Sequence, residues 1–108
     1  MQSLTLAVPP AAGSALRVTL DAVVDWLNGG ERDWPPSIHV ADGVDAGMLT
    51  RRLRMAAVWA GSCRVGVFKA GDGTASAAAE LVGEHATITL ALVIDPETRI
   101  LRLADVAP

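Results

Sequence analysis

Apolar side chains recur with a helical period twice in the first half of the chain. Between residues 14 and 28, five of them share one helix face: Leu16, Leu20, Val23, Val24 and Leu27. Ser14 is placed to cap the start of this helix, and the glycines at 29 and 30 end it. A second stretch, from Asp45 to about Ala60, repeats the pattern and stops at Gly61,. The first half therefore predicts two helices.

The second predicted helix carries two neighbouring stripes. The stripe expected to face the core contains Leu49, Leu53, Ala56 and Ala60. The adjoining stripe contains Met48, Arg52, Met55 and Trp59. Trp59 is expected to pack in the core, and the arginines at 51, 52 and 54 are most simply a solvated face.

The second half of the chain reads as strands separated by turn residues. Four apolar runs cover residues 63–70, 74–82, 86–94 and 99–106, with glycine-rich or proline-containing turns between them,. The chain is therefore predicted to be an α+β domain, in which two helices pack on a curved four-stranded antiparallel meander. Residues 1–13, broken by Pro9-Pro10, form an arm or edge strand, and residues 14–108 form one domain.

The turns also predict the register of the sheet. If Gly83 faces Ala86 and Asp95 faces Thr98, both turns place the same residues on one face. The expected inner face is Val65, Val67, Ala75, Ala77, Ala79, Leu81, Ile88, Leu90, Leu92, Leu101 and Leu103, with Asp105 at its far end. The expected outer face is Phe68, Ala78, Glu80, Val82, Thr87, Thr89, Ala91, Val93, Ile100, Arg102, Ala104 and Val106.

The expected outer face is broadly apolar, although two helices can cover only one face of a four-stranded sheet. Half-exposed antiparallel sheets normally carry polar residues on the free face, and a broad apolar patch commonly marks an interface. We therefore expect a homodimer through this face, with Val93 near its centre. A different protein is the alternative occupant.

Composition and charge exclude several classes of function. The chain is 51% hydrophobic with a mean hydropathy of +0.36, which predicts a packed domain,. Its net charge of −3 disfavours nucleic-acid binding,. The N-terminus lacks a signal-peptide pattern, and the longest apolar run is about half of what a spanning helix needs, so no membrane contact and a cytoplasmic location are expected. Cys63 is the only cysteine, and no disulfide, metal or cofactor is expected,.

A resemblance to a known superfamily accompanies this pattern. The segment Asp21-Ala-Val-Val-Asp-Trp-Leu-Asn-Gly-Gly-Glu-Arg-Asp-Trp34 resembles the first-helix exit of the cystatin-like α+β roll. Ketosteroid isomerases, SnoaL-type polyketide cyclases and nuclear transport factor two share that roll. The second half, with Leu90-Ala-Leu-Val-Ile-Asp-Pro-Glu-Thr-Arg-Ile100, is similar to short roll domains found ahead of serine-hydrolase domains.

The resemblance, over residues 14–106, implies a cone-like roll that often dimerises through the outer face of its sheet. It also implies an isomerase or cyclase activity, but the isomerases use a tyrosine hydroxyl and this chain has no tyrosine. The Asp-Arg-Asp arrangement of the epoxide-hydrolase members is not matched residue by residue. No catalytic role is therefore carried over.

Six side chains remain candidates for a site. Asp105 is expected inside the cone, where a carboxylate in an apolar setting suits a general base, and Arg52 is expected near the same interior. Three tryptophans offer flat apolar surface to a ring-bearing ligand: Trp26, Trp34 and Trp59. His39, close to Asp42, suits acid–base or metal chemistry, although a solvated loop explains it more simply.

Three functions stay open at this point. The first is a non-catalytic roll domain that binds a small apolar ligand or a protein partner as a homodimer. The second is a cyclase or isomerase acting on a polycyclic or polyketide-like substrate with Asp105 as base. The third is a purely structural dimerisation module. The missing tyrosine and the scarcity of inward polar groups favour the first.

Overall fold

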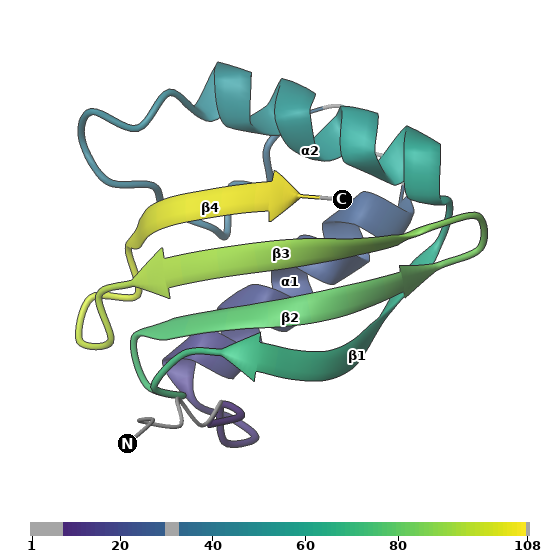
Figure 1. Ribbon diagram of the computed structural model, residues 1–108. Coiled ribbons are helices and arrows are strands. Elements are labelled where there is room, and N and C mark those ends of the chain that lie inside the picture. Colours follow the sequence, from purple (N-terminus) through teal and green to yellow (C-terminus); the bar gives the residue numbers. More distant parts are fainter. Residues whose placement is uncertain (1–7, 30–32, 108) are drawn as a thin grey trace, which may run out of the picture.

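Two helices and four strands make up the part of the chain that the structure, a computed structural model, describes: residues 8–29 and 33–107. The elements follow in the order α1 (Ala15–Gly29), α2 (Ala46–Ala60), β1 (Cys63–Ala70), β2 (Ser76–Gly83), β3 (Thr87–Ile94) and β4 (Leu101–Ala107). The strands pair in chain order into one antiparallel sheet (Figure 1). The predicted α+β class, two helices on a four-stranded antiparallel meander, is confirmed. The expected arm falls largely on residues 1–7, outside the described residues.

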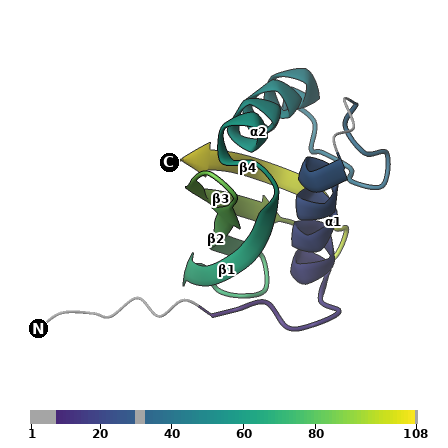
Figure 2. The same cartoon turned by 90° about the vertical axis from the view of Figure 1, so that its right-hand side faces the viewer.

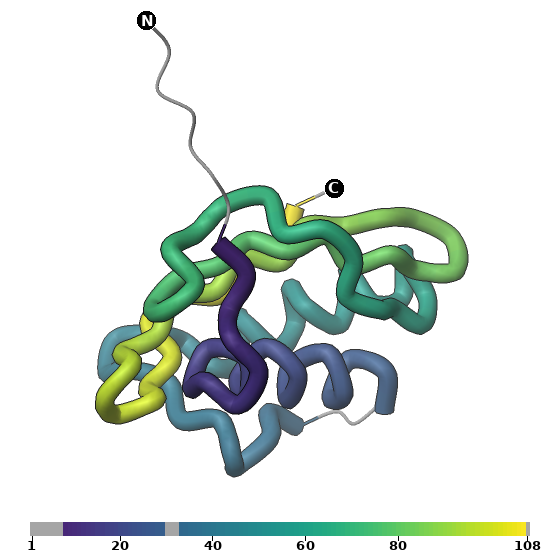
Figure 3. The backbone as a smooth tube through the Cα atoms, turned by 90° about the horizontal axis from the view of Figure 1, so that it is seen from below, coloured from purple at the N-terminus to yellow at the C-terminus, as the bar shows by residue number. Residues whose placement is uncertain are grey.

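The sheet forms one layer and the helices form the other (Figure 3). Helix α1 lies across one face of the sheet, here called the inner face, and α2 lies along the β4 edge (Figure 2). Neither helix covers the opposite, outer face. At the other end of the molecule, Val8 donates its amide to the Gly71 carbonyl at 3.1 Å, which ties the start of the described chain to the β1–β2 turn.

The helix ends follow the capping residues that the sequence indicated. The Ser14 hydroxyl accepts from the amide of Arg17 at 3.2 Å, and the Asp45 carboxylate accepts from the amide of Met48 at 3.1 Å,. Helix α2 ends at Gly61, whose φ of 80° suits glycine,. Both predicted helices are confirmed with these caps.

The core lies between α1 and the inner face of the sheet. Its main side chains are Leu16, Leu20, Val23, Leu27, Ala77, Leu81, Ile88, Leu90, Leu92, Ile94 and Leu101, none more than 5% exposed. Along β3 every second residue is buried, whereas the residues between them stay partly or fully exposed,. The predicted β2–β3 register is confirmed, with Leu81 opposite Ile88.

The expected register of β4 is wrong along the whole strand, and only its first residue, Leu101, keeps the expected face. The β3–β4 turn is two residues longer than expected, because Asp95 pairs with Ile100 and Arg99 takes a φ of 62°. This longer turn still leaves Leu101 on the inner face, opposite Ile94. A β-bulge then makes Arg102 an extra residue, so that Leu103 lies opposite Val93 on the outer face,.

The bulge turns over the rest of β4. Asp105 lies opposite Ala91 on the outer face, whereas Ala104 and Val106 lie opposite Leu92 and Leu90 on the inner face. The expected inward positions of Leu103 and Asp105, and the outward positions of Ala104 and Val106, are therefore wrong. A shift of one residue exchanges every side chain between the faces, because the side-chain period of a strand is two.

A bulge in β1 likewise exchanges side chains between the two faces of the sheet. Val65 lies opposite Leu81, but Phe68 lies opposite Ala79, so β1 uses three residues where β2 uses two. Phe68 therefore packs on the core side, with the Arg17 guanidinium 5.7 Å from its ring centre. Val67 is exposed instead. The sequence expectation had placed Phe68 outside and Val67 inside, and both are wrong.

A short extended segment before α2 has a structural role. Val40 forms a parallel bridge to Leu101, supported by hydrogen bonds from Leu101 to His39 and from Ala41 to Leu101 at 2.7 and 2.8 Å. The segment covers the start of the free edge of β4.

Leu90 and Leu103 provide a matched pair for testing the corrected register. Leu90→Ala should lower the free energy of unfolding by about 2–5 kcal/mol, because Leu90 is fully buried,. Leu103→Ala should cost less than about 1 kcal/mol, because Leu103 is 48% exposed,. Urea denaturation of dilute protein measures both values, and equal losses would contradict the bulge.

The β1–β2 turn depends on one carboxylate. The Asp72 side chain accepts hydrogen bonds from the amides of Thr74, Ala75 and Ser76 at 2.8, 2.8 and 3.1 Å. These bonds, led by that from Ala75, lower the pKa of Asp72 from its ordinary value of 3.8,. The stabilisation from this group is therefore present above the ordinary value and is lost as pH falls through the lowered pKa.

This linkage predicts how the stability of Asp72 variants depends on pH. Wild type should lose more stability than Asp72→Asn when the pH falls from neutral to about 2, because the amide oxygen of Asn still accepts the bonds but does not titrate. Urea denaturation across this range gives the two slopes. Parallel slopes would show that the Asp72 carboxylate is not held by the turn.

Candidate functional site

The structure distributes the six candidate side chains over three places. Arg52, Trp59 and Asp105 come together where α2 runs along β4. Trp26 and Trp34 meet at the C-terminal end of α1, with ring centres 5.2 Å apart at 65°. His39 is exposed on the extended segment and belongs to neither group.

Asp105 and Arg52 form an ion pair on the surface, between β4 and α2. Both side chains are about half exposed. The expectation that they enter an apolar interior is wrong, because the β4 bulge turns Asp105 outward. An exposed pair of this kind contributes about 0–1 kcal/mol and rearranges readily. Asp105 is therefore solvated, whereas a general base at this position would need an apolar surrounding,.

An apolar groove of about 400 Å³ lies next to this ion pair. Its walls are Arg52, Met55, Ala56, Trp59, Ile88, Val106 and Ala107. Trp59 is 56% exposed, so its expected place in the core is wrong. Helix α1 already fills the inner face of the sheet, and α2 therefore buries only its narrower stripe, Leu49, Leu53 and Ala60.

The sequence did not predict this groove, because the candidate residues were selected one at a time. Met55, Ile88 and Val106 were not candidates, although Met55 belongs to the stripe that also holds Arg52 and Trp59. A stripe of apolar residues beside the buried one was the available signal. The β4 register was needed to bring Val106 to the same place, and the sequence did not predict it.

Trp26 and Trp34 have structural partners. The indole of Trp26 donates to the Asp33 carbonyl, and that of Trp34 donates to the Ile38 carbonyl, both at 2.8 Å. Trp26 is buried and Trp34 partly so. These bonds fix the loop that connects α1 to α2, and they leave neither indole N–H free for a ligand.

Arg54 completes this cluster from α2. Its guanidinium lies 4.2 Å from the ring centre of Trp26 and donates to the carbonyls of Trp26 and Leu27 at 2.9 and 3.2 Å. Those carbonyls belong to the last turn of α1, where a positive charge is favourable. Arg54 therefore joins the two helices and is not part of a solvated cationic face.

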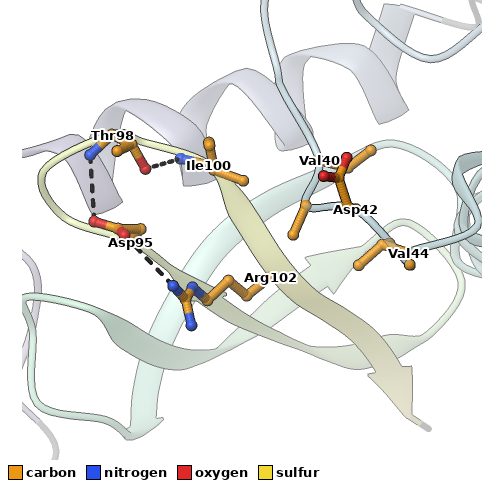
Figure 4. A pocket seen from close by; sticks show the side chains of 9 residues that line it. Val40, Asp42, Val44, Asp95, Thr98, Ile100 and Arg102 are labelled. Atoms are coloured by element: carbon orange, nitrogen blue, oxygen red, sulfur yellow. Dashed lines mark hydrogen bonds and ion pairs between the residues drawn. The ribbon is translucent and has the colours of Figure 1, made fainter.

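A polar hollow of about 520 Å³ lies where the loop before α2 meets the β3–β4 turn (Figure 4). Asp95 accepts from the amides of Glu97 and Thr98, which lower its pKa, and it pairs with Arg102 at 3.5 Å. Asp42 lies on the opposite side of the hollow (Figure 4). The charged groups of Asp95 and Arg102 are thus engaged in forming the turn.

The Cys63 thiol is buried and hydrogen-bonded. Burial, followed by the charge of Glu84, raises the pKa of the Cys63 thiol, which keeps it protonated at neutral pH,. The thiol donates to the Gly61 carbonyl at 3.2 Å. Within residues 8–29 and 33–107, no three His, Cys, Asp or Glu side chains converge to hold a metal ion.

Comparisons with protein-family models, curated proteins and solved structures find no match to this chain. The resemblance to the cystatin-like roll therefore stays a prediction. Neither of the described helices is long and apolar enough to cross a bilayer.

Proposed function

We propose that this protein is a non-catalytic binding domain that works as a homodimer through the outer face of its sheet. The observation that carries the proposal is the alternation along β3. Its inward residues are buried by the protein's own helix, whereas two of its four outward residues, Ala91 and Val93, are apolar and only partly covered.

The outer face keeps its apolar character after the two corrections of register. It loses Phe68, Ala104 and Val106, together with Ile100, which precedes β4 and lines the polar hollow. It gains Val67 and Leu103, which are both well exposed. The apolar members are then Val67, Ala78, Val82, Ala91, Val93 and Leu103.

Charged side chains share the outer face with these apolar residues. Glu80 lies between Ala78 and Val82 on β2 and pairs with Lys69 of β1 at 3.7 Å, and Asp105 lies on β4. Protein interfaces commonly combine apolar residues with paired charges. Two copies related by a two-fold axis would bring each patch onto itself, which is the commonest closed arrangement.

The placement of the ionisable groups favours binding over catalysis. Asp105, Arg52 and His39 are all on the surface, and the core between α1 and the sheet is built from apolar side chains. A cyclase or isomerase needs a base that projects into an enclosed apolar cavity. No described side chain of this chain supplies that combination, so the enzyme alternative has no feature in its favour.

The homodimer is tested by the mass of the protein in solution. Light scattering coupled to size exclusion should give a dimer for wild type at concentrations on the order of tens of micromolar. Val93→Arg should give a folded monomer, because it buries an unpaired charge in the interface. Val18→Arg, at an exposed site on α1, is the matched control and should remain dimeric.

A monomeric wild type at this concentration would overturn the homodimer. A dimeric Val93→Arg would show that the copies associate through a different surface.

A further inference from the structure

The polar hollow beside the β3–β4 turn has walls that are held in place by backbone hydrogen bonds (Figure 4). The loop before α2 is fixed to the start of β4, because Leu101 donates its amide to the His39 carbonyl at 2.7 Å and accepts from the Ala41 amide at 2.8 Å. The turn itself is closed by the amide of Asp95, which donates to the Ile100 carbonyl at 2.9 Å. The hollow is therefore formed before any ligand arrives, as small-molecule sites usually are.

The charges that line the hollow do not balance. Its lining includes two carboxylates, Asp42 and Asp95, and one guanidinium, Arg102. Arg102 pairs with Asp95 at 3.5 Å. Asp42 is exposed and forms no ion pair within residues 8–29 and 33–107, the described part of the chain. Two negative charges and one positive charge leave the hollow with one negative charge, and this charge belongs to Asp42.

Apolar side chains form another part of the lining. Val40, Val44 and Ile100 all line the hollow and are only partly buried by the protein (Figure 4). An apolar wall beside one unbalanced carboxylate favours a ligand that has an apolar body and one positively charged end. The volume of about 520 Å³ lies within the range of small-molecule sites, which is about 300–1,000 Å³,.

We propose that this hollow binds a small organic amine, with its ammonium group at Asp42 and its alkyl chain on the neighbouring apolar side chains. The ammonium supplies the positive charge that balances Asp42, and its N–H groups donate to the carboxylate. The ion pair between Asp95 and Arg102 stays intact when such a ligand binds, so the turn keeps the hydrogen bonds that Asp95 accepts.

The lining disfavours the other classes of small ligand. An anion would be repelled by Asp42, and the positive charge of Arg102 is already paired. A metal ion needs three or more convergent ligands, and no such group of His, Cys, Asp or Glu occurs among the described residues,. A neutral apolar molecule would desolvate the Asp42 carboxylate without pairing it.

The hollow and the proposed dimer face use different residues. None of the apolar members of the outer face, including Val93 at its centre, lines the hollow. Amine binding is measured by titration and the dimer by its mass, so either proposal can fail while the other holds.

The experiment is an NMR titration of the ¹⁵N-labelled whole protein with n-pentylammonium chloride at constant ionic strength. The amide signals of Gly43 and Thr98, which line the hollow, should shift and saturate. We expect a dissociation constant on the order of 1 mM, as for other ligands of this size. n-Pentanol has the same chain without the charge and should bind at least about fivefold more weakly. From n-propylammonium to n-pentylammonium, each added methylene should strengthen binding about twofold, because the chain is half-covered by the apolar wall.

Two variants test the position of the ammonium group. Asp42→Asn should weaken the binding of n-pentylammonium about fivefold, because it removes the carboxylate. It should keep the wild-type melting temperature, since Asp42 forms no ion pair with a described residue. Asp25→Asn, at an exposed position of α1, is the matched control. It removes the same charge from the chain and should leave the affinity unchanged.

The proposal is overturned if the shifts do not saturate, if n-pentanol binds as tightly as n-pentylammonium, or if Asp42→Asn binds as tightly as Asp25→Asn. An affinity that is independent of chain length would show that the apolar wall is not used and would also overturn it. N-acetyl-lysine methylamide carries the same ammonium group on a protein side chain. Tighter binding of this compound than of n-pentylammonium would assign the hollow to a lysine of a partner protein and overturn the free amine.

Discussion

Strand β3 is the constraint on which the rest of the molecule depends. Four of its side chains, Ile88, Leu90, Leu92 and Ile94, point to one face and are almost completely buried. Helix α1 packs its own apolar stripe against them. Burying a leucine or isoleucine side chain contributes about 1.5–3 kcal/mol, so a slip of β3 by one residue would expose the whole set. The pairing of β2 and β4 with β3 then decides which of their residues are inside.

The bulge in β4 places the carboxylate of Asp105 on the surface of the molecule. It keeps Leu101 inside but turns Leu103 and Asp105 outward. The interior is therefore apolar and filled by α1, while Asp105 joins Arg52 of α2 in an exposed ion pair. With α1 on the inner face, α2 is left along the β4 edge. Its second stripe, including Met55 and Trp59, has no partner within the described chain. Surfaces, and not an enclosed pocket, are what this arrangement offers to other molecules.

Much of the fold is predictable from the sequence because its signals are local. Ser14 and Asp45 cap the helices, Gly61 ends α2, and a tight turn at Gly83 sets the β2–β3 register. The three register shifts, two in β1 and one in β4, are not predictable in this way. The one at Arg102 follows a turn whose length depends on Arg99 taking a left-handed conformation, and it lies next to the bridge between Val40 and Leu101. Such a bridge joins residues far apart in the sequence.

The candidate site was less predictable than the fold for a related reason. A helical stripe shows which residues share a face, but not which of two stripes will be buried. The stripe of α2 that contains Trp59 is exposed because α1, and not α2, covers the inner face of the sheet. Trp26 and Trp34 were recognised as a pair near the end of α1 only in the structure, where Arg54 stacks on one of them. The candidates selected by residue type therefore included only two of the residues that line the groove, Arg52 and Trp59.

The central claim is that the β4 bulge turns the strand over and places Asp105 on the outer face. The most direct test is a methyl-labelled NMR experiment on the whole protein. We expect nuclear Overhauser contacts between the side chains of Val93 and Leu103 and between those of Leu90 and Val106, which are opposite each other across the strands. Contacts from Leu90 to Leu103, without any to Val106, would contradict the account and would return Asp105 to the inner face.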